Sequence, residues 1–183
     1  MRLPRKQPET RPDQSTATAT AAPVSAIDLR PAGSADLDAI NRVVEAALMS
    51  WPLPARVKRL SLPSYRYSAV DLEHLEMVVA LDRHQQIIGV AAWEEADTVD
   101  VPGDRKALLL HGIYVDPSCH RQGVGRELYR CAERAVRQYG YGGLLVKAQQ
   151  SANGFFMSQG MSRLQAEDPS RHYTNRFWMN ADR

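Results

Sequence analysis

The sequence predicts an α+β domain, in which helices sandwich a mixed β-sheet. Two strand-like apolar runs, 76–82 and 87–96, are separated by four polar residues and predict an antiparallel hairpin with a short loop. The run 107–115 is apolar almost throughout, which is typical of a central strand that is covered on both faces. Because a helix-rich segment precedes the hairpin and a strand–helix–strand order follows it, we expect a mixed sheet.

The N-terminal segment, residues 1–25, is predicted to be a disordered leader, and the domain is expected to span residues 26–183. The leader alternates charged residues, prolines and small residues, so it cannot bury enough apolar surface to pack. It lacks the apolar stretch of a secretory signal, and its acidic residues and prolines argue against a mitochondrial presequence. A short strand is expected at 26–30, before Pro31.

The first helix is predicted by apolar residues at helical spacing. Its apolar face is formed by Leu37, Ile40, Val43, Val44, Ala47 and Leu48. Gly33 and Ser34 can cap its start, and the segment Trp51-Pro52-Leu53-Pro54 ends it. Residues 55–76 are ambiguous and are expected to form one or two short helices.

The C-terminal half is expected to continue with a longer helix, from Arg126 to about Tyr139, followed by Gly140 as a natural C-cap. Its apolar stripe faces the sheet in this prediction, and its charged residues face solvent. The remaining elements are expected as a strand at 144–148, a short helix at 152–158, and weaker strands at 164–167 and 176–180.

The composition excludes several classes of function. The net charge of +2, from 23 basic and 21 acidic residues, is too balanced to indicate nucleic-acid binding. Cys119 and Cys131 do not make a disulfide framework, and no Cys/His cluster has zinc spacing, so no metal is expected. No apolar run is long enough to span a bilayer. We therefore expect a cytoplasmic protein without a nucleic-acid or membrane partner.

The stretch most informative about chemistry joins the central strand to the longer helix. A helix N-terminus carries backbone N–H groups without intrahelical partners and the positive end of the helix dipole. Because Gly123 and Gly125 carry no side chains, phosphate oxygens can approach these amides closely. The loop lacks the Lys-Ser/Thr of a P-loop and the third glycine of a dinucleotide fingerprint. It therefore predicts a phosphate or pyrophosphate site, and the alternative is a plain turn that leads into a helix.

The same stretch resembles a known family. The segment His120-Arg121-Gln122-Gly123-Val124-Gly125 is similar to the Arg/Gln-x-x-Gly-x-Gly/Ala motif of the GNAT superfamily of acyl-CoA-dependent N-acyltransferases, with His in the first position. Residues 152–161 resemble the family's Ala-x-x-Phe-Tyr-x-x-x-Gly-Phe segment, with Phe156 for Tyr and Met161 for the last Phe. The order of elements from 26 to 183 is also similar.

The resemblance implies a GNAT-type α/β/α sandwich around a mixed, mostly antiparallel sheet with a central, splayed pair of parallel strands. It implies acetyl-CoA as co-substrate without a metal, and direct transfer of the acetyl group to an amine acceptor in a ternary complex. It leaves a homodimer open. The residues that it implies for CoA binding are Ile113, Val115, His120, Arg121, Gln122, Gly123, Val124, Gly125, Arg126, Ala152, Phe155 and Phe156.

The departure with chemical consequences is Phe156. Members of the family often have a Tyr at this position, whose hydroxyl can protonate the departing CoA thiolate, and Phe has no such proton. A thiol with a pKa of about 8.5 is a tolerable leaving group near neutral pH, so the enzyme can do without this acid. Otherwise Tyr114, Tyr141 or Tyr173 serves, or the chain is a non-catalytic acyl-CoA-binding protein.

The candidate base is His111, in the central strand. An ammonium acceptor with a pKa of about 10 must lose a proton before it attacks, and an unperturbed His titrates near pH ~6.5. Arylalkylamine N-acetyltransferases are similar in having His residues on this strand. The alternative is a core histidine without a catalytic role. Glu94 and Glu95, one on each face of their strand, are the other candidate bases.

The acceptor is less defined by the sequence. Residues 51–70 contain basic and aromatic side chains and no Asp or Glu, which favours an acidic or aromatic acceptor unless the segment is a solvated loop. A small-molecule amine is favoured, and a protein lysine or N-terminus is the alternative.

Overall fold

The structure is a computed structural model that describes residues 27–103, 105–165 and 173–182. Within these residues the chain forms one seven-stranded sheet, in the order β1-β2-β3-β4-β5-β7-β6. The strands are β1 (Asp28–Pro31), β2 (Glu76–Leu81), β3 (Ile87–Glu95), β4 (Leu108–Val115), β5 (Gly143–Lys147), β6 (Ser162–Leu164) and β7 (Arg176–Asn180). The helices are α1 (Leu37–Ser50), α2 (Ala55–Ser61), α3 (Ala69–His74), α4 (Val124–Gln138) and α5 (Asn153–Ser158). The predicted leader lies outside the described residues.

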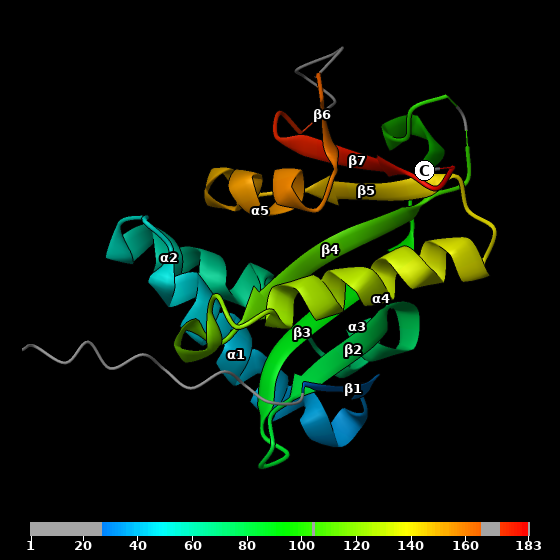
Figure 1. The fold of residues 1–183 in the computed structure, drawn as a ribbon. Coiled ribbons are helices and arrows are strands. Elements are labelled where there is room, and N and C mark those ends of the chain that lie inside the picture. Colours follow the sequence, from blue (N-terminus) through cyan, green and yellow to red (C-terminus); the bar gives the residue numbers. More distant parts are fainter. Residues whose placement is uncertain (1–26, 104, 166–172, 183) are drawn as a thin grey trace, which may run out of the picture.

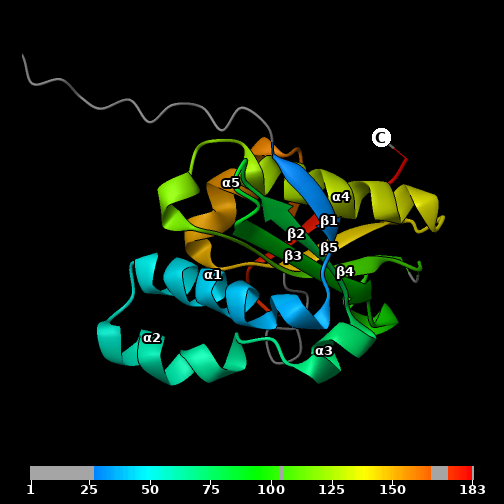
Figure 2. The ribbon, with the colours of Figure 1, turned by 90° about the horizontal axis from the view of Figure 1, so that it is seen from below.

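The helices cover both faces of the sheet. Helices α1, α2 and α3 lie on one face, and α4 and α5 lie on the other (Figure 2). The buried face of α1 contributes Ile40, Val43 and Val44 to a core with Val79 and Val90 of the sheet. A larger core on the opposite face joins α4 and α5 to the sheet, with residues such as Leu110, Leu128, Leu144, Phe156 and Phe177. The α/β/α sandwich expected from the resemblance is therefore confirmed.

The sheet is mixed because one pair of neighbours is parallel. Strands β4 and β5 pair in parallel, whereas the other neighbouring strands pair antiparallel. The parallel pairing covers only Leu108 to Leu110 on β4, although β4 continues to pair with β3 as far as Val115. The two central strands therefore separate beyond Leu110, and Figure 1 shows them diverging. This separation is the splayed parallel pair of the predicted fold class.

Most of the predicted elements are confirmed, with shifted boundaries. Helix α4 begins at Val124 and not at Arg126, because Gly123 takes the N-cap with a left-handed φ of 92°. Pro31 is the last residue of β1, which lies at the sheet edge, where proline is tolerated. The weak strand expected at 164–167 is instead β6, which ends at Leu164, and residues 166 and 167 lie outside the described residues.

Candidate active site

A β-bulge on the central strand sets the direction of His111. Ala92 of β3 pairs with Gly112 and the next residue, Trp93, pairs with Leu110, so His111 is an extra residue without a partner on β3. A bulge bends its strand and re-aims the side chain at that position. In the regular alternation His111 would point away from the face of Gly112. The bulge instead turns it to the face that carries Glu94 and Tyr114, which all line one cavity.

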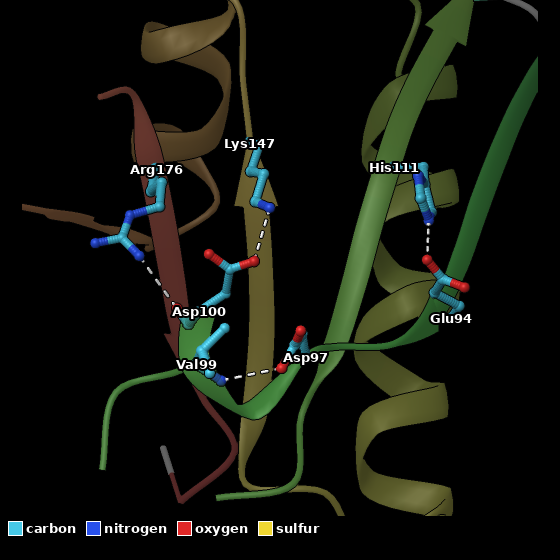
Figure 3. Close-up of polar contacts among 7 residues, drawn as sticks. All are labelled: Glu94, Asp97, Val99, Asp100, His111, Lys147 and Arg176. Carbon is cyan, nitrogen blue, oxygen red and sulfur yellow. Dashed lines mark hydrogen bonds and ion pairs between the residues drawn. The ribbon is translucent and has the colours of Figure 1, made fainter. Parts of the chain in front are cut away.

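His111 and Glu94 form a close pair. The distance from His111 Nε2 to Glu94 Oε1 is 2.7 Å, and Figure 3 shows the imidazole pointing across to the carboxylate of the neighbouring strand. The two side chains are 35% and 40% exposed, so both are open to a bound molecule. When Glu94 accepts the Nε2–H, the neutral imidazole keeps its lone pair on Nδ1. The pair therefore has the chemistry of an oriented base.

The cavity beside this pair has a volume of about 360 Å³. Its walls are Ser64, Tyr65, Arg66, Tyr67, Asp71, His74, Leu75, Glu94, His111 and Tyr114. The segment between α2 and β2 supplies most of them, so this segment forms the wall opposite the sheet. Residues 51–70 were expected to border the acceptor, whereas Asp71 and His74 carried no sequence signal for a site.

Tyr114 is the buried aromatic residue of this cavity. Its ring makes edge contacts with Tyr65 and Tyr67, at centroid distances of 6.5 Å and 6.3 Å. Burial raises the pKa of Tyr114 and of Tyr67 above the ordinary tyrosine value. The ring folds back over Gly112, where an added Cβ would lie 2.7 Å from it. A glycine is therefore needed here for Tyr114 to lie against its own strand.

The other candidate acids and bases lie elsewhere. Tyr141 donates to Glu95 at 2.9 Å, on the face of the sheet opposite Glu94. Tyr173 is 44% exposed and does not line the cavity at His111. Phe156 is buried in the core under α4 and α5, where its ring packs against Phe155 and Phe177. Of the three tyrosines considered, the structure brings only Tyr114 next to His111.

The predicted phosphate loop presents a row of backbone amides, those of residues 121–126, that lack partners in the described chain. Arg121 and Gly123 both have left-handed φ angles, of 63° and 92°. This alternation of handedness turns successive N–H groups toward one side, an arrangement that binds anions. The first helical bond that closes on the loop is from Glu127 N–H to Gly123 O, so the amides of residues 124–126 have no intrahelical partner.

Side-chain hydrogen bonds hold the conformation of this loop. Asp116 accepts from the Ser118 amide and hydroxyl, and Gln122 Nε2 donates to Ser118 O at 3.1 Å. His120 Nε2 lies 3.1 Å from Val115 O, which ties the loop to the end of β4. His120 and Gln122 therefore shape the loop, and Val124 is buried in the core. Arg121 and Arg126 are exposed.

The remaining predicted CoA residues lie on β4 beyond its pairing with β5 and around the start of α5. Ile113 and Val115 lie on β4 beyond Leu110, the last residue that pairs with β5. No described strand therefore pairs with these two residues on the β5 side of β4. Phe155 packs over Gly125, where an added Cβ would lie 3.3 Å from the ring. Ala152 precedes α5 and packs on the same core as Phe155.

Figure 3 also shows a separate polar cluster, which belongs to the connection between β3 and β4. Lys147 pairs with Asp100 at 2.7 Å, and the buried Arg176 donates to the Asp100 carbonyl at 3.2 Å. These contacts fasten the connection to β5 and β7, away from the cavity at His111. In the part of the chain that the structure describes, no group of three or more His, Cys, Asp or Glu side chains is placed to hold a metal ion. No helix among the same residues combines the length and apolarity needed to cross a bilayer.

Comparison with known proteins relates this architecture to one family. The model of the acetyltransferase (GNAT) family matches residues 41–161. No curated protein matches the sequence. The chain is similar to the solved structure of the PaiA N-acetyltransferase from Thermoplasma acidophilum in complex with coenzyme A, with 11% identity and a TM-score of 0.69 over 85% of this chain and 99% of that one.

Two further structures are similar at comparable identity. One is a GNAT family acetyltransferase from Brucella melitensis in complex with acetyl-CoA, with 17% identity and a TM-score of 0.55 over 85% of this chain and 88% of that one. The other is a KacTA–DNA complex, with 17% identity and a TM-score of 0.59 over 86% of this chain and 94% of that one. At such identities the likeness is one of fold.

Proposed function

The chain belongs to the acetyltransferase (GNAT) family, and from this premise we propose that it transfers the acetyl group of acetyl-CoA to a primary amine, by direct attack in a ternary complex. The observation that carries the proposal is the pairing of His111 with Glu94, at 2.7 Å, inside a cavity beside the splayed strands β4 and β5. A cavity of about 360 Å³ suits a small-molecule amine better than a folded protein surface.

The loop before α4 fits the pyrophosphate of CoA. The amides of residues 121–126 donate no hydrogen bond to another described residue, and no atom lies within 4 Å of a Cβ placed on Gly123. Phosphate oxygens therefore have both donors and space at this position. The edge of β4 that no strand pairs offers the backbone groups of Ile113 and the N–H of Val115 to the pantetheine arm, whereas the Val115 carbonyl already lies 3.1 Å from His120 Nε2. Acetyl-CoA supplies the acyl group as a thioester, whose thiolate leaves when the amine attacks.

His111 serves as the base in this proposal. Glu94 holds the Nε2–H, orients the ring and stabilises the imidazolium that forms when Nδ1 takes the proton of the acceptor ammonium, directly or through one water. An ammonium with a pKa of about 10 is almost fully protonated at neutral pH, so this proton must leave before the nitrogen can attack. A positioned base is worth on the order of 10²–10⁴ in rate.

Tyr114 is the acid that the cavity offers to the thiolate. The Tyr114 hydroxyl carries a proton at neutral pH that it can donate as the thiolate leaves, and burial, which raises the pKa of Tyr114, makes it a weaker acid than an exposed tyrosine. Tyr114 lines the same cavity as His111, so its hydroxyl lies on the side of β4 where the reacting amine is proposed to bind. Phe156 cannot take this role, since it has no hydroxyl and its ring is buried in the core.

Phe156 also favours a second candidate function, an acyl-CoA-binding sensor without turnover. One measurement distinguishes the transferase from the sensor, namely the release of free thiol from acetyl-CoA across a panel of primary amines. The transferase requires amine-dependent thiol release that Gly123→Val and His111→Ala both reduce. Tight acetyl-CoA binding by calorimetry, with no thiol released by any amine, would instead establish the sensor.

A further inference from the structure

A second cavity, of about 340 Å³, adjoins the one at His111. His74 and Glu94 line both cavities, so the two meet at these side chains. The other walls of the second cavity are Glu76, Trp93, Glu95, Leu108, Tyr139 and Tyr141. None of these six residues has a part in the proposed acetyl transfer.

The second cavity lies where the sheet has a notch. Strand β2 begins at Glu76, which pairs with Trp93, so β3 continues for two residues, Glu94 and Glu95, that have no partner on that side. Successive residues of a strand point to opposite faces, so Glu94 faces His111 and Glu95 faces the side that α4 covers. The notch therefore joins the catalytic face of the sheet to the opposite face around the start of β2.

The walls of the second cavity are acidic and aromatic. Tyr139 donates to Glu76 at 2.8 Å, and Tyr141 donates to Glu95 at 2.9 Å. The hydroxyl of Tyr141 and the nearby charge of Lys106 lower the pKa of Glu95, so this carboxyl is ionised at neutral pH. The rings of Tyr139 and Tyr141 pack edge to face, at a centroid distance of 6.0 Å. Carboxylates beside aromatic rings are the surroundings that an ammonium group prefers.

The charge of the joined cavities is also negative. Their described walls contain four carboxylates, on Asp71, Glu76, Glu94 and Glu95, whereas Arg66 is the one Lys or Arg side chain among them. Arg66 is itself paired with Glu45, at 3.0 Å. Glu95 is also paired with Lys106, at 3.4 Å, so the excess of negative charge comes from Asp71, Glu76 and Glu94. This excess would repel an anionic acceptor, which the basic segment 51–70 favours by composition alone.

We infer that the acceptor carries a second ammonium group, which the cavity at Glu76 and Glu95 binds while the reacting amine lies beside His111. The acceptor class is thus diamines and polyamines. This inference rests on the proposed acetyl transfer, because the reacting amine is placed by that proposal. Glu76 and Glu95 determine specificity in it and take no part in the chemical step.

The test compares putrescine with butylamine, which has the same carbon chain and lacks the second ammonium. With acetyl-CoA and wild-type protein, kcat/KM for putrescine should exceed that for butylamine. The substitutions Glu76→Gln and Glu95→Gln should each reduce this ratio, by about three- to fivefold, the range expected for one partly exposed ion pair. Glu76→Gln should leave butylamine turnover unchanged. The matched control is Glu133→Gln on the outer face of α4, where Glu133 pairs with Arg137, and it should leave the ratio as in wild type.

Calorimetric titration of putrescine and of butylamine, in the presence of CoA, together with the turnover assay, distinguishes failure of the second ammonium site from failure of the proposed acetyl transfer. Equal turnover of the two amines by wild type, or a ratio that neither substitution changes, overturns the second ammonium site and leaves the transferase intact. Binding of putrescine that depends on Glu76, without thiol release, supports the site and removes the transferase. Circular dichroism of each variant checks that the fold is retained.

Discussion

Substitution of the two paired residues, His111 and Glu94, tests which of them is the base and which of them orients it. His111→Ala removes the imidazole, and Glu94→Gln keeps an oxygen that can still accept the Nε2–H while it removes the charge. Both side chains are more than a third exposed, at 35% for His111 and 40% for Glu94. Neither change leaves a buried polar group unpaired, so we expect the melting temperature of both variants to stay close to that of wild type.

The expected costs in rate differ by at least an order of magnitude. If His111 is the base, His111→Ala should reduce kcat/KM by about 10²–10⁴-fold, the usual worth of a positioned base. The charge of Glu94 acts on an imidazolium that solvent screens, and exposed ion pairs of this kind are worth at most about 1 kcal/mol. Glu94→Gln should therefore cost about fivefold or less, because 1.4 kcal/mol corresponds to a factor of ten.

The assay is thiol release from acetyl-CoA, measured as kcat/KM across pH. A base must be unprotonated to act, so kcat/KM should rise with pH, and His111→Ala should abolish that rise. A larger loss for Glu94→Gln than for His111→Ala would make Glu94 the base and refute the assignment. If both variants keep the wild-type rate and pH profile, the pair has a structural role alone.

Three further predictions concern the loop and the core. Gly123→Val should weaken acetyl-CoA binding by calorimetry, because its added side chain enters the open space before α4, and it should lower the melting temperature, because a β-branched residue is strained at the left-handed φ of 92°. Gly125→Val should lower the melting temperature for a different reason, since its Cβ meets Phe155 at 3.3 Å; unchanged acetyl-CoA affinity of Gly123→Val would contradict the role of the loop. Phe156→Tyr should destabilise the protein by about 1–3 kcal/mol in denaturant unfolding, as the new hydroxyl is buried among apolar rings, and a gain in activity without loss of stability would show instead that the site has room for it. Tyr129→Phe should raise the melting temperature by about 2–4 °C, because the buried Tyr129 hydroxyl has no hydrogen-bond partner among the described residues, and a fall in melting temperature would reveal a partner such as water.

The elements of the fold were predictable where periodicity is strong. The continuous apolar run that ends at Val115 predicts a strand covered on both faces, and β4 is that strand, between the cores of α1 and α4. Boundaries were less predictable, because caps depend on backbone geometry that composition does not encode. Gly123 starts α4 earlier than expected by adopting a left-handed conformation. The short β6 is defined by its pairing with β7 and not by an apolar pattern of its own.

The site was predictable in its residue types and less so in its geometry. His111, Glu94 and Tyr114 were named from the sequence, but regular alternation places consecutive side chains on opposite faces and does not bring these three together. The bulge at His111 appears only when β4 is aligned against β3, which is long-range information. The notch at Glu76 has the same origin, since it arises from the offset between the start of β2 and the end of β3.

Both irregularities of β4 occur at one point of the strand, and this coincidence explains why the chemistry is expected there. Pairing with β5 stops at Leu110, and the bulge that disturbs pairing with β3 is the next residue, His111. On the β5 side, the strand beyond this point has backbone groups free for an extended arm such as pantetheine. On the α1 side, the bulge aims His111 at Glu94. An acyl thioester that enters through the splay and an amine that enters through the cavity would thus converge at His111, the first residue of β4 after Leu110 that pairs with neither β3 nor β5.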